Sequence, residues 1–467
     1  MRAAELPARL DVDVMSHPSV WRSGGARVRL GEPQVTEPVG EPQSLRSNFV
    51  WTFGGNVTYV VCQWGMIVAL AKLGNSFMVG QFSLGLAIVT PVLMFANLDL
   101  RAVQATDSTR QFYFAEYLRL RITTTLAAVA VILSLLLLGN YEKPTALVIL
   151  AVGFAKAIET LSDIHYGLFQ LNDRLDQTGM SMMLRGVIAV VALCAAMQLT
   201  HQVLWACTCI AIGWLGSLLF FDVRTGRRVV QSTESVTLSR RARGLARLRN
   251  LLWLALPLGM GTTIASINLY MPRYFIHAKM GEHALGIFSA IGYATVAMTL
   301  VGDSLAQCVI PRMSRLYASA RMTEFRRLLT RLVTAAGVIG LIGLILAHSM
   351  GRRFLTLVYS REYALNPSVF TLLTAAAAIQ FAASMLTSGI TSARCFRIQV
   401  PLFLIVAACT AAGCALWVPG RGLAGAAVAV LVAATVRFAL AGLVVRHLIW
   451  RPAGSGPARL GFWGPSI

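Results

Sequence analysis

The chain has 467 residues, of which 56% are hydrophobic and only 13% are charged, and its mean hydropathy is +0.65. This composition excludes an ordinary soluble protein and predicts an all-α protein that crosses a membrane many times. The formal net charge is +21, but excess arginine in a polytopic protein is typical of its cytoplasmic loops, so we expect no nucleic-acid partner.

Residues 1–46 balance six arginines against six acidic residues and are rich in proline and glycine, which predicts a disordered tail. Because a spanning helix needs about 20 largely apolar residues, the remaining sequence predicts twelve spans. They are 50–72, 79–98, 118–138, 145–168, 180–199, 203–222, 251–276, 284–309, 330–349, 367–390, 400–418 and 423–445. An even number of spans places both termini on one side of the membrane.

The distribution of arginine indicates which side that is. Loop 223–250 holds eight arginines and one acidic residue, and loop 311–331 holds six and one. The opposite loops are short and nearly neutral, except for 351–366 with its three arginines. We therefore expect the inner (cytoplasmic) membrane, both termini in the cytoplasm, and 351–366 as a local exception, perhaps best described as a short interfacial helix. The arginine-rich face should attract anionic lipids.

A short sequence pattern recurs in the two halves of the chain. Ala-Lys-x-Gly at 71–74 and Gly-x-Phe-Ser at 80–83 match Ala-Lys-x-Gly at 278–281 and Gly-x-Phe-Ser at 286–289. Each copy surrounds the turn between the first two spans of a six-span half, so the halves are predicted to be parallel repeats. The predicted parts are a tail at 1–46, an N-lobe at 47–222, a basic linker at 223–250, a C-lobe at 251–447 and a cytoplasmic tail at 448–467.

Charged residues inside the spans indicate a polar path, because a charge at bilayer depth is costly and normally faces a bundle interior or a wet cavity. Lys156, Glu159 and Asp163 share one face of the fourth span and are candidates for a cavity wall. Either acid is also a candidate for binding a coupling proton or sodium ion. The alternative is a Lys156–Glu159 pair that only locks the bundle. Arg273, in the seventh span, either lines the cavity or reaches the outer interface.

The repeat relates further polar residues. Asp303 in the eighth span corresponds to the end of the second span, which carries Asp99 and Arg101. These acids either line one vestibule or pair with arginines of the nearby loops. Arg185 and Arg437, within the fifth and last spans, are similar candidates for the polar path.

Motifs of catalysis are missing from the sequence. The seven histidines are scattered, the eight cysteines lie almost entirely in apolar runs without a CxxC pair, and there is no glycine-rich phosphate loop with its lysine. The sequence therefore predicts a transporter with no enzyme activity, cofactor or metal site. An ion gradient, a substrate gradient or a partner would supply its energy.

Four stretches of the first half resemble a known family. They are VGQFSLGLAI at 79–88, PVLMFANLDLRAVQATD at 91–107, YLRLR at 117–121 and SDIHYGLFQLNDRLDQTGMSMMLRG at 162–186. Together they resemble the polysaccharide transporter (Wzx-like) family of the multidrug/oligosaccharidyl-lipid/polysaccharide (MOP) flippase superfamily, which the second half resembles more loosely. The resemblance implies two lobes with twelve or fourteen helices. It also implies a central cationic cavity for a lipid-linked, pyrophosphate-bearing oligosaccharide, and a place among polysaccharide assembly proteins of the cell envelope.

Three other functions are weighed against this flippase. An ion-coupled multidrug or small-metabolite exporter of the same superfamily would favour a smaller, more acidic and aromatic cavity. A major-facilitator transporter shares twelve helices and parallel halves, but its Gly-x-x-x-Asp-Arg-x-Gly-Arg loop is replaced here by 97–107. A membrane enzyme of glycan assembly is disfavoured by the short outer loops. We therefore expect a flippase that works by alternating access, whose glycan, lipid carrier and coupling ion the sequence leaves open.

Overall fold

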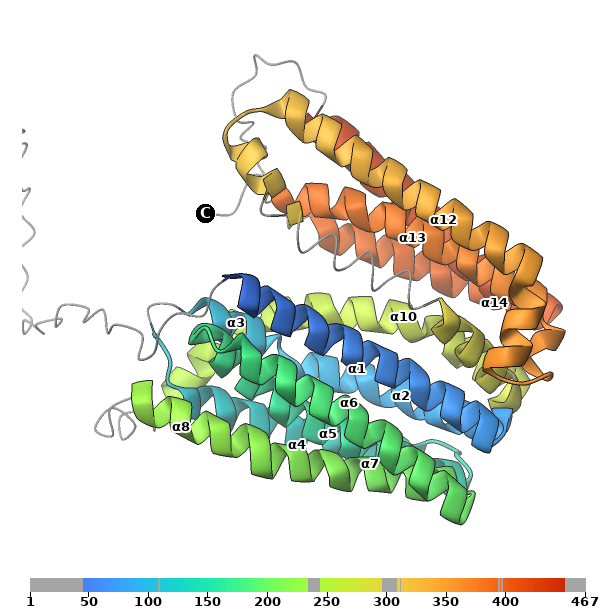
Figure 1. Ribbon diagram of the computed structural model, residues 1–467, viewed down its shortest axis with the longest axis horizontal. Coiled ribbons are helices and arrows are strands. Elements are labelled where there is room, and N and C mark those ends of the chain that lie inside the picture. The colour runs from blue at the N-terminus through green and yellow to red at the C-terminus, as the bar shows by residue number, and fades with distance from the viewer. Residues whose placement is uncertain are drawn as a thin grey trace, which may run out of the picture. The chain divides into compact units, whose positions relative to one another are not determined.

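Long helices make up the first half of the protein (Figure 1). They are α1 (Leu45–Leu73), α2 (Ser76–Asn97), α3 (Leu100–Thr106), α4 (Phe114–Leu138), α5 (Lys143–Leu171), α6 (Leu175–Thr200), α7 (Val203–Ser217), the π-helical turn η1 (Leu218–Asp222) and α8 (Val223–Thr233). The second half contains α10 (Leu245–Ala294), α12 (Met322–Val358), the 3-10 turn η2 (Tyr363–Leu365), α13 (Pro367–Ser392) and α14 (Gln399–Ile449).

The computed structural model describes residues 45–107, 110–233, 244–295, 309–310, 312–393, 395 and 398–449. All of them belong to the unit Gly40–Ile467. Asp303, the predicted N-terminal tail up to residue 44 and the predicted C-terminal tail from residue 450 lie outside the described residues.

Ten of the described helices are long and apolar enough to span a membrane. Two of them, α10 and α14, bend at Gly281 (φ 80°) and Gly422 (φ 56°), a backbone conformation that glycine adopts at little cost. Each of these two therefore contains two helical segments, which match the predicted spans seven and eight and the predicted spans eleven and twelve. The predicted all-α, polytopic fold is confirmed.

Several helix ends differ from the prediction. The sixth span continues through η1 into α8, so only part of the predicted linker 223–250 lies between helices. Helix α12 continues to Val358, so the prediction of a separate loop from residue 351 was wrong for its first eight positions. A hydropathy pattern marks where apolar residues stop, whereas backbone hydrogen bonds hold the helix together beyond that point.

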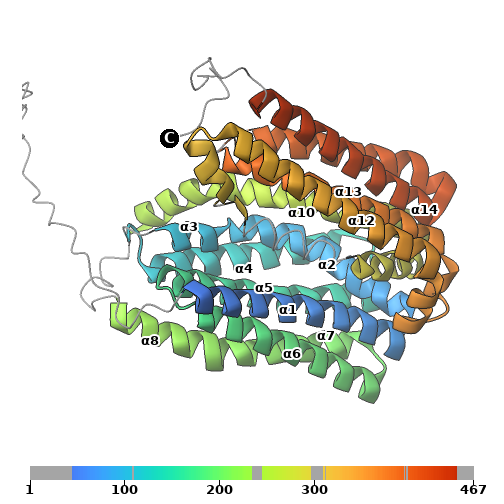
Figure 2. The ribbon, with the colours of Figure 1, turned by 45° about the horizontal axis from the view of Figure 1, so that its top comes forward.

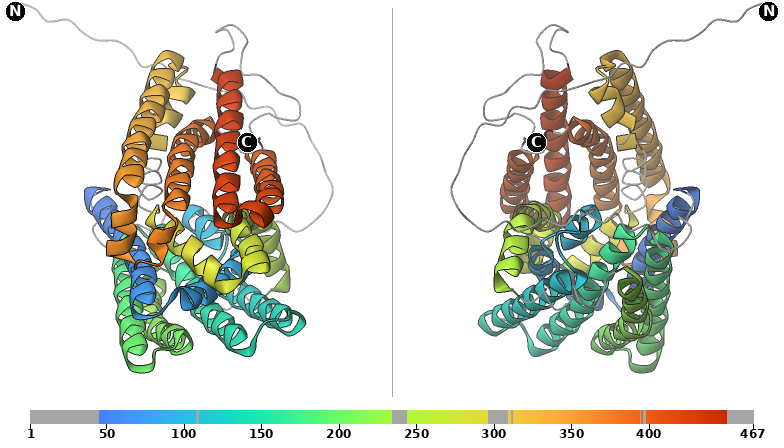
Figure 3. Two further views of the ribbon diagram at one scale, coloured as in Figure 1. Left: turned by 90° about the vertical axis from the view of Figure 1, so that its right-hand side faces the viewer. Right: turned by 90° about the vertical axis from the view of Figure 1, so that its left-hand side faces the viewer.

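The helices form two groups with α10 between them. In the first group α1 packs along α6, and α5 packs against α2, α4 and α7. In the second group α13 packs against α12 and α14, as Figure 2 shows. Helix α10 packs against both α2 and α14, and Figure 3 shows it between the blue-to-green helices and the orange and red ones.

The repeated sequence pattern meets itself where α2 crosses the second segment of α10. A Cβ atom on Gly80 would lie 1.9 Å from the Glu282 carbonyl oxygen, and one on Gly286 would lie 1.8 Å from the Ser76 carbonyl oxygen. Ser76 and Gly80 correspond to Glu282 and Gly286 in the repeat, so each contact is the counterpart of the other. Such an exchange is typical of elements related by a two-fold axis, as parallel repeats are.

Candidate functional site

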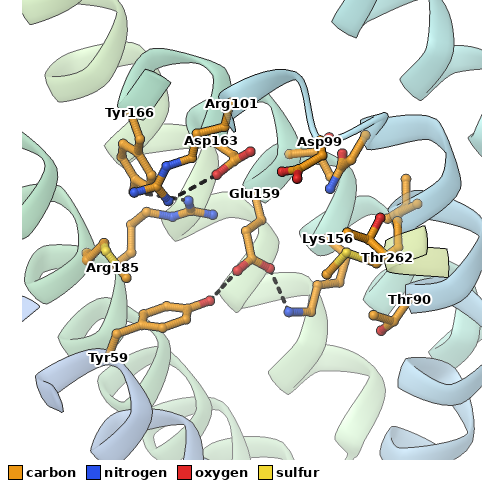
Figure 4. Close-up of a pocket in the computed structure, with 15 residues that line it drawn as sticks. Tyr59, Thr90, Asp99, Arg101, Lys156, Glu159, Asp163, Tyr166, Arg185 and Thr262 are labelled. Atoms are coloured by element: carbon orange, nitrogen blue, oxygen red, sulfur yellow. Dashed lines mark hydrogen bonds and ion pairs between the residues drawn. The ribbon is translucent and has the colours of Figure 1, made fainter. Parts of the chain in front are cut away.

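A cavity of about 330 Å³ lies in the first group of helices where it meets α10 (Figure 4). Helix α10 contributes Thr262 to its wall, and α1 contributes Tyr59. Its charged lining residues come from the junction of α2 with α3, from α5 and from α6; they are Asp99, Arg101, Lys156, Glu159, Asp163 and Arg185. The structure thus brings together five of the residues predicted for the site, and adds Arg185.

A backbone reversal between α2 and α3 positions Arg101. Leu98 and Asp99 both have left-handed backbone conformations, with φ of 51° and 48°, which cost roughly 1–2 kcal/mol per residue outside glycine. Leu98 is buried, so tertiary packing maintains this conformation against the local preference of leucine. The reversal directs α3 back across α5 and places the Arg101 guanidinium 5.4 Å from the centre of the Tyr166 ring.

Asp163 is held by two arginines from other helices. Arg101 lies 3.3 Å away and Arg121 lies 3.2 Å away, measured between guanidinium nitrogen and carboxylate oxygen. The Arg121 side chain is fully buried and also donates a hydrogen bond to Asn97 at the end of α2. Arg121 lies behind the cavity wall, and sequence reasoning missed it. The available signal was an arginine within the YLRLR motif at the start of the third span.

Lys156 and Glu159 form an ion pair of 2.6 Å on the cavity wall. Tyr59 donates a second hydrogen bond to Glu159, and Gln63 donates to the Tyr59 hydroxyl at 2.8 Å. The two readings of this pair are therefore compatible, since the residues are paired with each other and also line the cavity.

Arg185 is the most deeply buried cation of the wall. Its guanidinium lies 4.7 Å from the centre of the Trp214 ring and donates to the Tyr166 hydroxyl at 3.4 Å. Within the described part of the chain, its Nε and Nη2 atoms are buried and have no hydrogen-bond acceptor. Buried donors of this kind are normally satisfied, so the arrangement leaves room for an anionic acceptor from outside the protein.

The remaining candidates lie elsewhere. Arg273 does not belong to the cavity wall; its guanidinium stacks 4.7 Å from the ring centre of Tyr270 and 5.6 Å from that of Tyr293. Arg437 lies 5.2 Å from the centre of the Phe403 ring. Cations and acids therefore alternate in the cavity itself: the wall carries three of each, with Arg121 as a fourth cation behind it.

Comparisons with known proteins agree on the fold. No family model matches the chain. Its sequence is similar to the capsular polysaccharide biosynthesis protein CapF of Staphylococcus aureus, with 25% identity over 387 residues that cover 82% of this chain and 95% of that protein. Its structure resembles the lipid II flippase MurJ in an inward closed conformation, with a TM-score of 0.64, 10% identity, and coverage of 84% of this chain and 86% of that one.

A second solved structure has the same architecture. It is an inward-facing multidrug resistance MATE family transporter of the MOP superfamily, with a TM-score of 0.60, 14% identity, and coverage of 89% of this chain and 97% of that one. The protein is a multi-pass membrane protein with the fold of MOP superfamily transporters. Within that superfamily, the predicted resemblance to the Wzx-like polysaccharide flippases is confirmed.

Proposed function

We propose that the protein moves a lipid-linked, polyprenyl-pyrophosphate oligosaccharide, or a related envelope polysaccharide precursor, across the cytoplasmic membrane by alternating access. The similar protein CapF is named for capsular polysaccharide biosynthesis, and the structural neighbour MurJ is named as a lipid II flippase. A head group with sugars and phosphates does not cross hydrocarbon unaided, because its polar groups would lose their water. The proposal gives the chain no catalytic step.

The incompletely paired guanidinium groups of the cavity carry this proposal. Arg185 has two buried nitrogen donors without an acceptor among the described residues, and Arg101 keeps 30% of its side chain exposed. A phosphate oxygen accepts such donors in a fork geometry, and arginine keeps its charge at any accessible pH. The three wall carboxylates compete for the same cations, which favours release as well as binding.

Closure at one end of the cavity supports alternating access. At the crossing of α2 and α10, the Ser76 hydroxyl donates to Glu362 at 2.6 Å and contacts His283 at 2.8 Å. Nearby, Trp64 donates to the Tyr359 hydroxyl at 3.0 Å. These contacts connect the two groups of helices at the end opposite α3, so the passage to that side requires them to break.

The proposal also fixes an orientation. With both termini in the cytoplasm, as the arginine distribution favours, the α3 end faces the cytoplasm. The exposed arginines of α8, Arg224, Arg227 and Arg228, then lie at the level of anionic head groups. Other polysaccharide assembly proteins would supply the glycan precursor and use it on the far side.

An ion-coupled exporter of drugs or small metabolites is the second candidate. The observation that favours it is the presence of three carboxylates and two tyrosines in the cavity wall, together with the resemblance to a multidrug transporter structure. A bulky glycan head and a small cationic drug make opposite demands on these carboxylates.

Complementation in a strain that lacks its own polysaccharide flippase tests the proposal. We expect the wild-type protein to restore surface polysaccharide, Arg185→Ala to abolish it, and Arg185→Lys to restore it in part. Arg224→Ala, an exposed arginine outside the cavity, is the matched control and should behave as wild type. Failure of the wild-type protein at normal membrane levels, combined with a gain in drug resistance, would favour the exporter instead.

A further inference from the structure

Asp222 is a buried carboxylate outside the cavity. It ends η1, the π-helical turn in the sixth span, and is completely buried. A π-helical turn costs hydrogen-bond geometry and is found frequently at functional sites. Within the described part of the chain no ion pair reaches Asp222, and its Oδ2 atom has no hydrogen-bond partner. The Ser162 hydroxyl, also fully buried, interacts with this carboxylate from α5 and makes no hydrogen bond in the present geometry.

A chain of hydrogen bonds connects Asp222 to the cavity. Ser181 donates to Asp222 Oδ1 at 2.6 Å, so its hydroxyl oxygen accepts from the Tyr166 hydroxyl, which lies 2.8 Å away. Tyr166 in turn accepts from Arg185 at 3.4 Å. Because Tyr166 and Arg185 both line the cavity, the charge state of Asp222 acts on a cation that faces the transported molecule.

The cavity carboxylates are in a different situation. Glu159 is paired with Lys156 at 2.6 Å, and Asp163 is paired with Arg101 and Arg121. Both keep their charge at low cost, because their cations compensate it. Asp222 lacks such a partner in a fully buried position, and an ionised carboxylate there is expensive.

We infer that Asp222 is a proton-binding site that couples proton occupancy to the cavity through Ser181, Tyr166 and Arg185. One proton binds to the unpartnered Oδ2 atom and neutralises the carboxylate, and no other bond needs to change. The other titratable and charged groups that face Asp222 are His165 and Tyr166 on α5 and Arg185 on α6, while the arginines of α8 are exposed. As the coupling site of transport, this inference rests on the proposed function; as a proton site, it does not.

Infrared difference spectroscopy of the purified full-length protein, titrated with acid in detergent without substrate, tests the inference. Wild type should show a protonated-carboxyl band that appears on acidification, and Asp222→Asn should lose it. Glu159→Gln and Asp163→Asn each remove one carboxylate from the same bundle and should keep that band. Ser181→Ala should keep the band but shift its frequency, since the hydrogen bond to Oδ1 is lost.

Two results would overturn the inference. One is an unchanged band in Asp222→Asn, or an unshifted band in Ser181→Ala should the first variant fail to fold. The other is a band that responds to added sodium chloride at constant pH, which would assign the site to a sodium ion. Because no glycan is present, a failed glycan-transport assay leaves the spectroscopic result intact, so the two claims fail separately.

Discussion

Replacing Arg121 by alanine should destabilise the protein more than any other single change of a cation around the cavity. Its side chain is fully buried and holds both Asp163 and Asn97. Removing one partner of a buried ion pair typically costs about 3–5 kcal/mol. Because Asp163 keeps 29% exposure and its second arginine, we expect a loss of about 3 kcal/mol, or roughly a hundredfold in the ratio of folded to unfolded protein. Denaturant unfolding in mixed micelles measures this free energy.

Two matched variants test the reasoning behind this magnitude. Arg101→Ala removes the half-exposed partner of the same carboxylate and should cost much less, because water replaces the lost contact. In the double variant Arg121→Ala/Asp163→Asn the orphaned charge is gone, so part of the lost stability should return. Equal losses for Arg101→Ala and Arg121→Ala, or purely additive losses in the double variant, would refute the account of Arg121 as a buried positioning residue.

Two further predictions concern the crossing of the repeats and the ion pair on the cavity wall. Gly80→Val should separate α2 from α10, so a cysteine at the buried Ser76 position should change from protected to reactive toward a membrane-impermeant thiol reagent; continued protection would contradict the close crossing. Lys156→Met should lower the melting temperature in detergent by leaving Glu159 without its cation, and Lys156→Met/Glu159→Gln should recover part of the loss. A double variant that melts below the single one would contradict the pairing.

Most of the fold follows from local features of the sequence. Apolar runs of spanning length predicted the helices, and the glycine-containing repeat predicted the crossing at which Gly80 and Gly286 meet. Helix ends were less predictable, because α12 continues through Arg352 and Arg353, where hydropathy indicates the end of the span. The reversed backbone at Leu98 was also not predictable, since buried contacts rather than leucine's own preference maintain it.

The site could be predicted only as far as one helix reaches. Helical spacing placed Lys156, Glu159 and Asp163 on one face, and the structure puts all three on the cavity wall. The partners that decide their chemistry come from distant parts of the chain, as Arg121 does for Asp163 and Ser181 does for Asp222. Such pairings depend on how helices pack side by side, which a periodic pattern within one helix does not encode.

The central claim is that the cavity carries a pyrophosphate-bearing lipid from one leaflet to the other. The most direct measurement reconstitutes the purified protein into liposomes that contain a lipid-linked pyrophosphoryl oligosaccharide in both leaflets. A membrane-impermeant glycosidase added outside then reports how much of the lipid reaches the outer leaflet. With the wild-type protein we predict that the enzyme consumes nearly all of the lipid with time, whereas with Arg185→Ala it stops at the fraction that began outside. Wild-type liposomes that stop at the same fraction as protein-free ones would contradict the account.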